Sequence, residues 1–157
     1  MVDTKSILIC PACGNIMEKV YLSNVDMFVD ICTDGCGGIY FDNREAESLN
    51  VEKGNFNIIL SKIEGKNFIP VDETKVRICP SCGAVMTKIG AAGGEVTVDV
   101  CYTCGGQFLD NGEFQKIHSN NAKSIDEAIF EMMAQKSAST HKIPRRTFFE
   151  DMIKKFL

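Results

Sequence analysis

The 157-residue sequence predicts a small, metal-stapled α+β protein with two tandem β-hairpin units, short helices and an α-helical C-terminal extension. The first observation behind this prediction is a repeat, because Cys-Pro-x-Cys-Gly occurs at residues 10–14 and again at 79–83. The second is that all eight cysteines fall into the two repeats, four in each. The third is that residues 120–157 contain no cysteine and carry apolar residues at helical spacing.

The cysteine spacing predicts a metal site in each repeat. A CxxC pair, a spacer of about fifteen to twenty residues and a second close pair are typical of tetrahedral zinc. A unit of about forty residues buries too little apolar surface to fold without such a staple. The glycine after each CxxC, Gly14 or Gly83, is expected to take a positive φ and turn amides towards the sulfurs. We expect two zinc ions, with these ligands: Cys10, Cys13, Cys32 and Cys36 in one site, and Cys79, Cys82, Cys101 and Cys104 in the other.

Other uses of eight cysteines are possible chemically. Four thiolates also suit a rubredoxin-like iron centre, which would make the protein an electron carrier. Zinc is preferred, because a duplicated site without a partner cofactor motif suits a scaffold better than electron transfer. Disulfides or free buried thiols do not explain two matched quartets. A thiol oxidoreductase needs an activated CxxC near a βαβ pattern, which the sequence lacks. We therefore expect a protein that is not an enzyme.

Strands are expected at equivalent places in the two repeats. Residues 15–22 and 26–32 read as a hairpin, and 39–41 as a short third strand. In the second repeat the hairpin turn falls within 91–95, and 107–109 form the third strand.

Each predicted hairpin places a lysine opposite an aspartate. Lys19 falls opposite Asp30, and Lys88 falls opposite Asp99. A cross-strand ion pair worth at most about 1 kcal/mol is preferred over a catalytic pair.

Two carboxylates three residues apart follow each third strand. They are Asp42 and Glu45 in the first repeat, and Asp110 and Glu113 in the second. Because each pair precedes an apolar helical pattern, a helix N-cap with its reciprocating carboxylate is preferred over an acid/base pair.

The predicted domains are a first ribbon at 1–50, a connection at 51–76, a second ribbon at 77–119 and a helical extension at 120–157. The connection is apolar enough to pack on the ribbons. It contains a short predicted helix that stops at Gly65 and carries four apolar residues at helical spacing: Phe56, Ile59, Leu60 and Ile63.

The extension is expected to form two helices, which begin near Ser124 and Thr147 and are separated by residues 137–144. The last helix has an apolar stripe that could pack on its own domain, on another chain (including self-association) or on a membrane surface. The stripe consists of Phe148, Phe149, Met152, Ile153, Phe156 and Leu157. Both histidines, His118 and His141, are expected to be solvated rather than ligands.

The charge disfavours a nucleic-acid partner. The formal net charge is −4, and two filled four-thiolate sites would bring it to about −8. A contact through Lys142, Arg145 and Arg146 remains the nucleic-acid alternative. No stretch approaches the roughly 20 apolar residues of a membrane span, and the N-terminus lacks the apolar core of a secretory signal. We therefore expect a cytoplasmic protein, where thiols stay reduced.

The two repeats resemble the zinc-ribbon family named after transcription factor IIB. The resemblance rests on the family pattern of CPxCG, a hairpin, VDxCxxCGG and an aromatic-Leu-Asp-x-Gly-Glu finish, the last of which stands at residues 108–113. It implies zinc on the eight cysteines, no catalysis, and by its name a role in transcription. The first repeat departs from the pattern, because three residues separate Cys32 from Cys36 and Arg44 stands where the second repeat has Gly112.

Together these features predict a structural zinc-binding protein that presents its ribbons and last helix to a macromolecular partner, with protein favoured over nucleic acid. The two sites are not expected to be equal. The first knuckle, which is the segment from Cys32 to Cys36, is one residue longer than its counterpart at 101–104. It carries Asp34, whose charge adds to a centre that is already formally −2, while Gly35 relieves backbone strain. We therefore expect the first site to lose metal first when chelator is added or pH falls.

Overall fold

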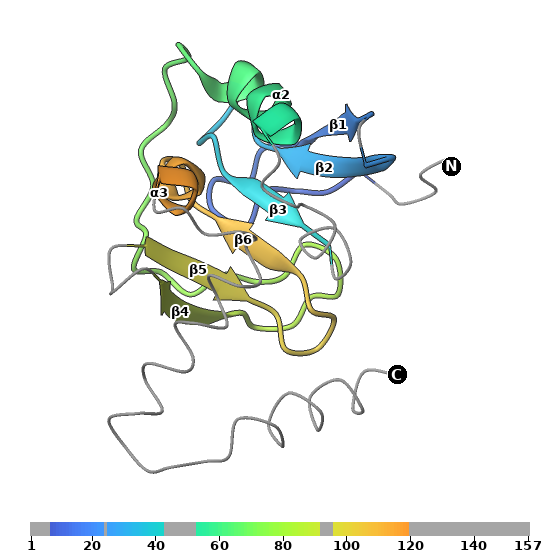
Figure 1. Cartoon of the computed structure of the whole chain (residues 1–157). Coiled ribbons are helices and arrows are strands. Elements are labelled where there is room, and N and C mark those ends of the chain that lie inside the picture. The colour runs from blue at the N-terminus through green and yellow to red at the C-terminus, as the bar shows by residue number, and fades with distance from the viewer. Residues whose placement is uncertain (1–6, 24, 43–52, 92–95, 120–157) are drawn as a thin grey trace, which may run out of the picture.

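The computed structural model describes residues 7–23, 25–42, 53–91 and 96–119 (Figure 1). Within them, each repeat contributes three strands, and one helix follows each set. The first repeat contains β1 (Glu18–Leu22), β2 (Met27–Ile31) and β3 (Ile39–Phe41), and the helix α2 (Lys53–Ile63) leads to the second repeat. The second repeat contains β4 (Thr87–Ala91), β5 (Val96–Val100), β6 (Gln107–Leu109) and the helix α3 (Glu113–Ser119).

The hairpins form in the predicted register. Antiparallel β1 and β2 place Lys19 opposite Asp30, and β4 and β5 place Lys88 opposite Asp99. Side chains alternate between the two faces of a strand, so the valines and isoleucines of these β-rich segments share one face while the aspartates face the other. Predicted third strands at 39–41 and 107–109 are confirmed as β3 and β6.

The six strands form one sheet in the order β1-β2-β3-β6-β5-β4. Its central contact is the antiparallel pairing of β3 with β6, in which Tyr40 lies opposite Phe108 (Figure 1). Every residue of these two strands is buried. The sequence analysis predicted two hairpin units and did not predict this pairing, which joins both repeats into a single sheet.

One face of the sheet packs against the two helices. Ile59 and Ile63 of α2 and Phe114 of α3 lie in one apolar core with the strand side chains of that face. Phe114 stacks on Phe41 of the first repeat, with ring centroids 6.1 Å apart. The predicted helix of the connection is therefore present and packs on the ribbons, and Gly65, with φ of 74°, follows its end as expected.

The opposite face of the sheet carries a second core that contains cysteines from both repeats. Tyr40 and Phe108 lie at its centre and are fully buried. The core is formed by Leu8, Cys10, Met17, Cys32, Cys36, Tyr40, Cys79, Met86, Cys101 and Phe108. The predicted metal ligands of the two repeats thus share one apolar environment.

Several predicted features lie outside the described residues. These are the C-terminal extension at 120–157 with its two helices and apolar stripe, Glu45 of the first cap, and the histidine side chains. In the part of the chain that the structure describes, no helix is long and apolar enough to cross a membrane.

Candidate metal centres

The first cysteine pair of each site lies on a tight turn. The N–H of Gly14 donates to the carbonyl of Cys10 (2.9 Å), and the N–H of Cys10 donates to the carbonyl of Asn15 (2.7 Å). Gly14 has φ of 81°, which a residue without Cβ adopts at no steric cost. The second repeat forms the same turn, with Gly83 at φ of 75°. The predicted positive φ of these two glycines is confirmed, and their own N–H groups donate to the carbonyls of Cys10 and Cys79.

The second cysteine pair of each site comes directly after a hairpin. The N–H of Cys32 donates to the carbonyl of Gly38 (2.8 Å), and the N–H of Cys101 donates to that of Gly106 (2.8 Å). In each repeat, the chain therefore folds back between the hairpin and the third strand. This turn returns the second pair opposite the first.

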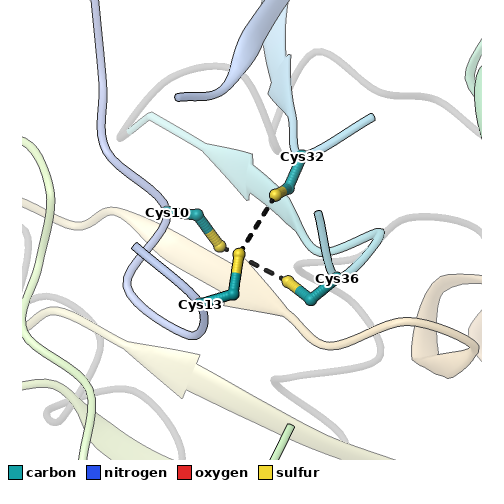
Figure 2. Close-up of side chains that lie close together, drawn as sticks. All are labelled: Cys10, Cys13, Cys32 and Cys36. Atoms are coloured by element: carbon teal, nitrogen blue, oxygen red, sulfur yellow. Dashed lines mark hydrogen bonds between the residues drawn. The ribbon is translucent and has the colours of Figure 1, made fainter. Parts of the chain in front are cut away.

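The eight cysteines form two groups of four, whose sulfur atoms lie within 4.8 Å of one another in each group. Figure 2 shows the four sulfur atoms of the first group pointing towards a common centre. Sulfur atoms of Cys10 and Cys36, and of Cys13 and Cys32, are 3.4 Å apart. Four sulfurs around zinc at about 2.3 Å would be about 3.8 Å apart, so both groups fit the ion closely.

The thiols of the first group cannot all be ionised without a cation. Hydrogen bonding to Cys10 lowers the pKa of Cys32 to about 2, whereas hydrogen bonding to Cys32 raises the pKa of Cys10 to about 12. Hydrogen bonding to Cys10 also raises the pKa of Cys36. The mutual contacts therefore hold protons on some sulfurs, and a dication that neutralises four thiolates releases those protons on binding.

The longer knuckle of the first site packs tightly around Gly35 and is held by hydrogen bonds from the connecting segment. A Cβ on Gly35 would lie 2.5 Å from the sulfur of Cys32, and Gly35 is not among the positive-φ residues. Gly35 is thus required for space and not, as expected, for backbone conformation. Its carbonyl accepts the N–H of Ile69 (2.9 Å), and Lys66 donates to the carbonyl of Thr33 (3.3 Å). Asp34 is exposed, so solvent screens part of the charge that we expected to weaken this site.

Each repeat places an aromatic ring against the knuckle of the other. A Cβ on Gly106 would lie 2.0 Å from the hydroxyl oxygen of Tyr40, and one on Gly38 would lie 2.4 Å from Cζ of Phe108. The Tyr40 hydroxyl lies 3.3 Å from the sulfur of Cys79. Burial raises the pKa of Tyr40, so this hydroxyl keeps its proton.

The lysine and aspartate pairs form ion pairs, as preferred. Lys19 Nζ lies 3.1 Å from Asp30 Oδ1, and Lys88 Nζ donates to both carboxylate oxygens of Asp99 at 2.9 Å. Burial raises the pKa of Asp99, and the Lys88 ammonium opposes that shift. Both aspartates are buried on the sheet, where the ammonium groups compensate their charge.

The predicted cap of α3 forms in part. Glu113 accepts the N–H of Asp110 (2.7 Å), as a reciprocating carboxylate should, and also the N–H of Thr97 (2.9 Å). The Asp110 carboxylate instead accepts two hydrogen bonds from the buried guanidinium of Arg77, at 3.2 and 3.3 Å. Sequence reasoning missed Arg77. The available clue was that the equivalent residue of the first repeat is Leu8, so a charge occupies a position that can be apolar.

Comparison with known proteins finds one family model, described as Transcription factor zinc-finger, which matches residues 9–50 and 78–120. The two segments together make up more than half of the chain, and each contains one four-cysteine group. No curated protein and no solved structure matches the chain.

Proposed function

The chain belongs to the transcription factor zinc-finger family, and from this premise we propose that it is a structural, non-catalytic protein that presents an apolar ribbon surface to a protein partner. It binds two zinc ions, each through four cysteines. The proposed ligand sets are the two groups that the sequence predicted: Cys10, Cys13, Cys32 and Cys36, and Cys79, Cys82, Cys101 and Cys104.

The observation that carries the proposal is a row of exposed aliphatic side chains beside the CxxC turn of each repeat. Three such residues precede or follow each CxxC turn at equivalent positions, and they are 50% to 69% exposed. They are Ile7, Ile9 and Ile16 in the first repeat, and Val76, Ile78 and Val85 in the second. Exposed apolar patches of this kind mark interaction sites in soluble proteins.

The row has a defined geometry beside each CxxC turn. Ile9 pairs with Ile16 in an antiparallel bridge, and Ile78 pairs with Val85 in the same way, so the two members of each pair share a face. Neighbouring Leu8 points the other way and is buried. A closed four-cysteine site holds this surface rigid, which supports a scaffolding role for zinc.

The charge of the chain supports a protein partner. The net charge is negative, and filled thiolate sites make it more so, which opposes contact with phosphate backbones. The gathering of all eight cysteines into two complete groups of four, which leaves no cysteine for chemistry, supports a non-catalytic role. The eight cysteines form no disulfide, which supports the cytoplasm as the compartment. The family description supports a process related to transcription, and the stripe at 148–157 is proposed as a second contact.

The test compares partners captured by the full chain and by two surface variants. Ile9→Ser with Ile16→Ser removes the bridged pair of the first apolar row, and Ile78→Ser with Val85→Ser removes that of the second. A control variant, Glu64→Ser with Asn67→Ser, changes two exposed polar residues outside both rows. We expect the partner to be lost from either row variant but retained by the control, with zinc content and circular dichroism unchanged. Equal capture by all variants would show that the apolar rows do not bind the partner.

A chain that ends at about residue 120 tests the contribution of the extension. If it keeps every partner, the stripe at 148–157 is not a docking element. A mobility-shift assay at low salt addresses nucleic acid, because phosphate contacts bind most tightly there. Any shift that weakens steeply with salt would favour the nucleic-acid alternative over the protein partner.

A further inference from the structure

The second metal centre receives a side chain from the first repeat. The hydroxyl of Tyr40 in β3 lies 3.3 Å from the sulfur of Cys79 and 3.9 Å from that of Cys104. These two sulfurs are 3.5 Å apart and belong to the four-cysteine group of the other repeat. The contact is buried, so water does not compete for the hydroxyl.

The two halves of the sheet are nearly symmetric around this contact. A single row crosses all six strands, and its members in order are Lys19, Asp30, Tyr40, Phe108, Asp99 and Lys88. The row reads the same from either end except at its centre. There the first repeat has tyrosine and the second has phenylalanine, so within this row the second metal centre is offered a hydroxyl and the first is not.

The backbone at the second knuckle leaves room for this approach. A Cβ on Gly106 would lie 2.0 Å from the Tyr40 hydroxyl oxygen and 2.7 Å from its ring carbon Cζ, closer than real atoms come. Glycine at this position therefore lets the phenol reach the sulfurs. The equivalent glycine of the first repeat, Gly38, is covered by the Phe108 ring, which has no donor.

A zinc-bound cysteine is a thiolate and can only accept hydrogen bonds, whereas a neutral phenol can donate one. We propose that Tyr40 is a positioning residue of the second zinc site. Its hydroxyl donates a hydrogen bond to the sulfur of Cys79 and thereby favours the thiolate, the form of that sulfur that binds zinc. The second site is then completed by the first ribbon, and the two sites differ in affinity because Phe108 cannot do the same. This inference rests on the proposed ligand sets.

The substitution Tyr40→Phe removes only the hydroxyl and keeps the buried ring. Loss of a partner to a metal ligand typically lowers metal affinity by about 10- to 100-fold. We expect that loss at the second site, measured by equilibrium competition with a chelator, while the first site keeps its affinity. The control is Tyr21→Phe, because the hydroxyl of the exposed Tyr21 donates to Asp26 beside the turn of the first hairpin.

A spectroscopic measurement separates hydrogen bonding from packing. With cadmium-113 in both sites, each centre gives its own resonance, which can be assigned through coupling to cysteine protons. Tyr40→Phe should move the resonance of the second centre and leave that of the first in place. Unchanged second-site affinity and resonance, or equal losses at both sites, would overturn the proposal, because either result would make Tyr40 a packing residue only.

The reciprocal substitution Phe108→Tyr offers the missing hydroxyl to the first site. By the symmetry of the row, the new hydroxyl would face Cys10 and Cys36, and we expect the first site to gain affinity. If this variant loses its sheet signal in circular dichroism, Tyr40→Phe decides alone. Wild-type protein that binds no zinc would refute the proposed function itself, whereas two zinc ions with an inert Tyr40→Phe change would refute only this inference.

Discussion

Substitution of Phe108 by alanine tests whether the two ribbons form one structural unit. The Phe108 ring is fully buried at the centre of the sheet and lies against Gly38 of the other repeat. It belongs to the same apolar core as the cysteines of both groups. Its removal therefore creates a cavity beside both metal centres, although the residue itself belongs to the second repeat.

The cost can be estimated from the burial. Truncating a buried phenylalanine to alanine costs about 3 to 5 kcal/mol, the sum of lost transfer free energy and the cavity that remains. Typical domains have a free energy of unfolding of about 5 to 15 kcal/mol, so this loss is a large fraction of it. Because the cavity lies at the junction of β3 and β6, we expect weaker zinc binding in the first repeat as well as in the second.

Urea unfolding of the zinc-loaded protein, followed by circular dichroism and by zinc release, measures both effects. We expect one cooperative transition with a lower midpoint, and zinc release from both sites within it. The control is Tyr102→Ala in the second knuckle, because Tyr102 is 40% exposed and its loss should cost about 0.5 kcal/mol or less. If Phe108→Ala weakened only the second repeat and left the first site and its unfolding unchanged, the single-sheet account would be wrong.

Three further predictions follow from buried charges and from the unequal sites. Arg77→Leu should lower the free energy of unfolding by about 3 to 5 kcal/mol, because it leaves the Asp110 carboxylate buried without its guanidinium partner. In urea titrations, adding Asp110→Asn to this variant should recover part of the loss. If no stability is recovered, the ion-pair explanation is contradicted. Burial raises the pKa of Glu113 to about 7, against about 4.3 in an unfolded chain. The stabilisation from its protonated form is therefore complete below about pH 4.3 and is lost as pH rises through 7, by roughly 4 kcal/mol. The stability difference between wild type and Glu113→Gln should therefore change between pH 5 and 8, and a difference independent of pH would refute the assignment. In an equilibrium titration with a chelator, the first site should lose zinc before the second, as the sequence predicted. Cys32→Ser should then abolish the weaker step of zinc loss, and Cys101→Ser the tighter one. The reverse assignment would show that the longer knuckle is not the weaker site.

Local sequence patterns were sufficient to predict most of the site. Cysteine spacing predicted both quartets, and alternation within the hairpins placed Lys19 opposite Asp30 and Lys88 opposite Asp99 in the register that the structure has. These features depend on residues close in sequence, or on a hairpin whose turn fixes its register.

Contacts between residues far apart in the sequence were not predictable in this way. Three-residue apolar segments such as 39–41 indicate strands but not which strand they pair with, so the β3–β6 contact was missed. Asp110 was predicted as a helix cap because Glu113 follows it, but Arg77, 33 residues earlier, binds its carboxylate. Tyr40 was predicted only as a residue of the third strand, and its contact with Cys79 depends on the sheet that joins the repeats.

The central claim is that each ribbon holds one zinc ion through its own four cysteines. Native mass spectrometry of the purified chain, together with its visible absorption spectrum, tests this most directly. The account predicts two zinc ions per chain with no visible absorption, and one zinc ion in Cys101→Ser. A red protein with visible charge-transfer absorption from iron, or a wild-type chain that carries fewer than two metal ions after growth in zinc, would contradict it.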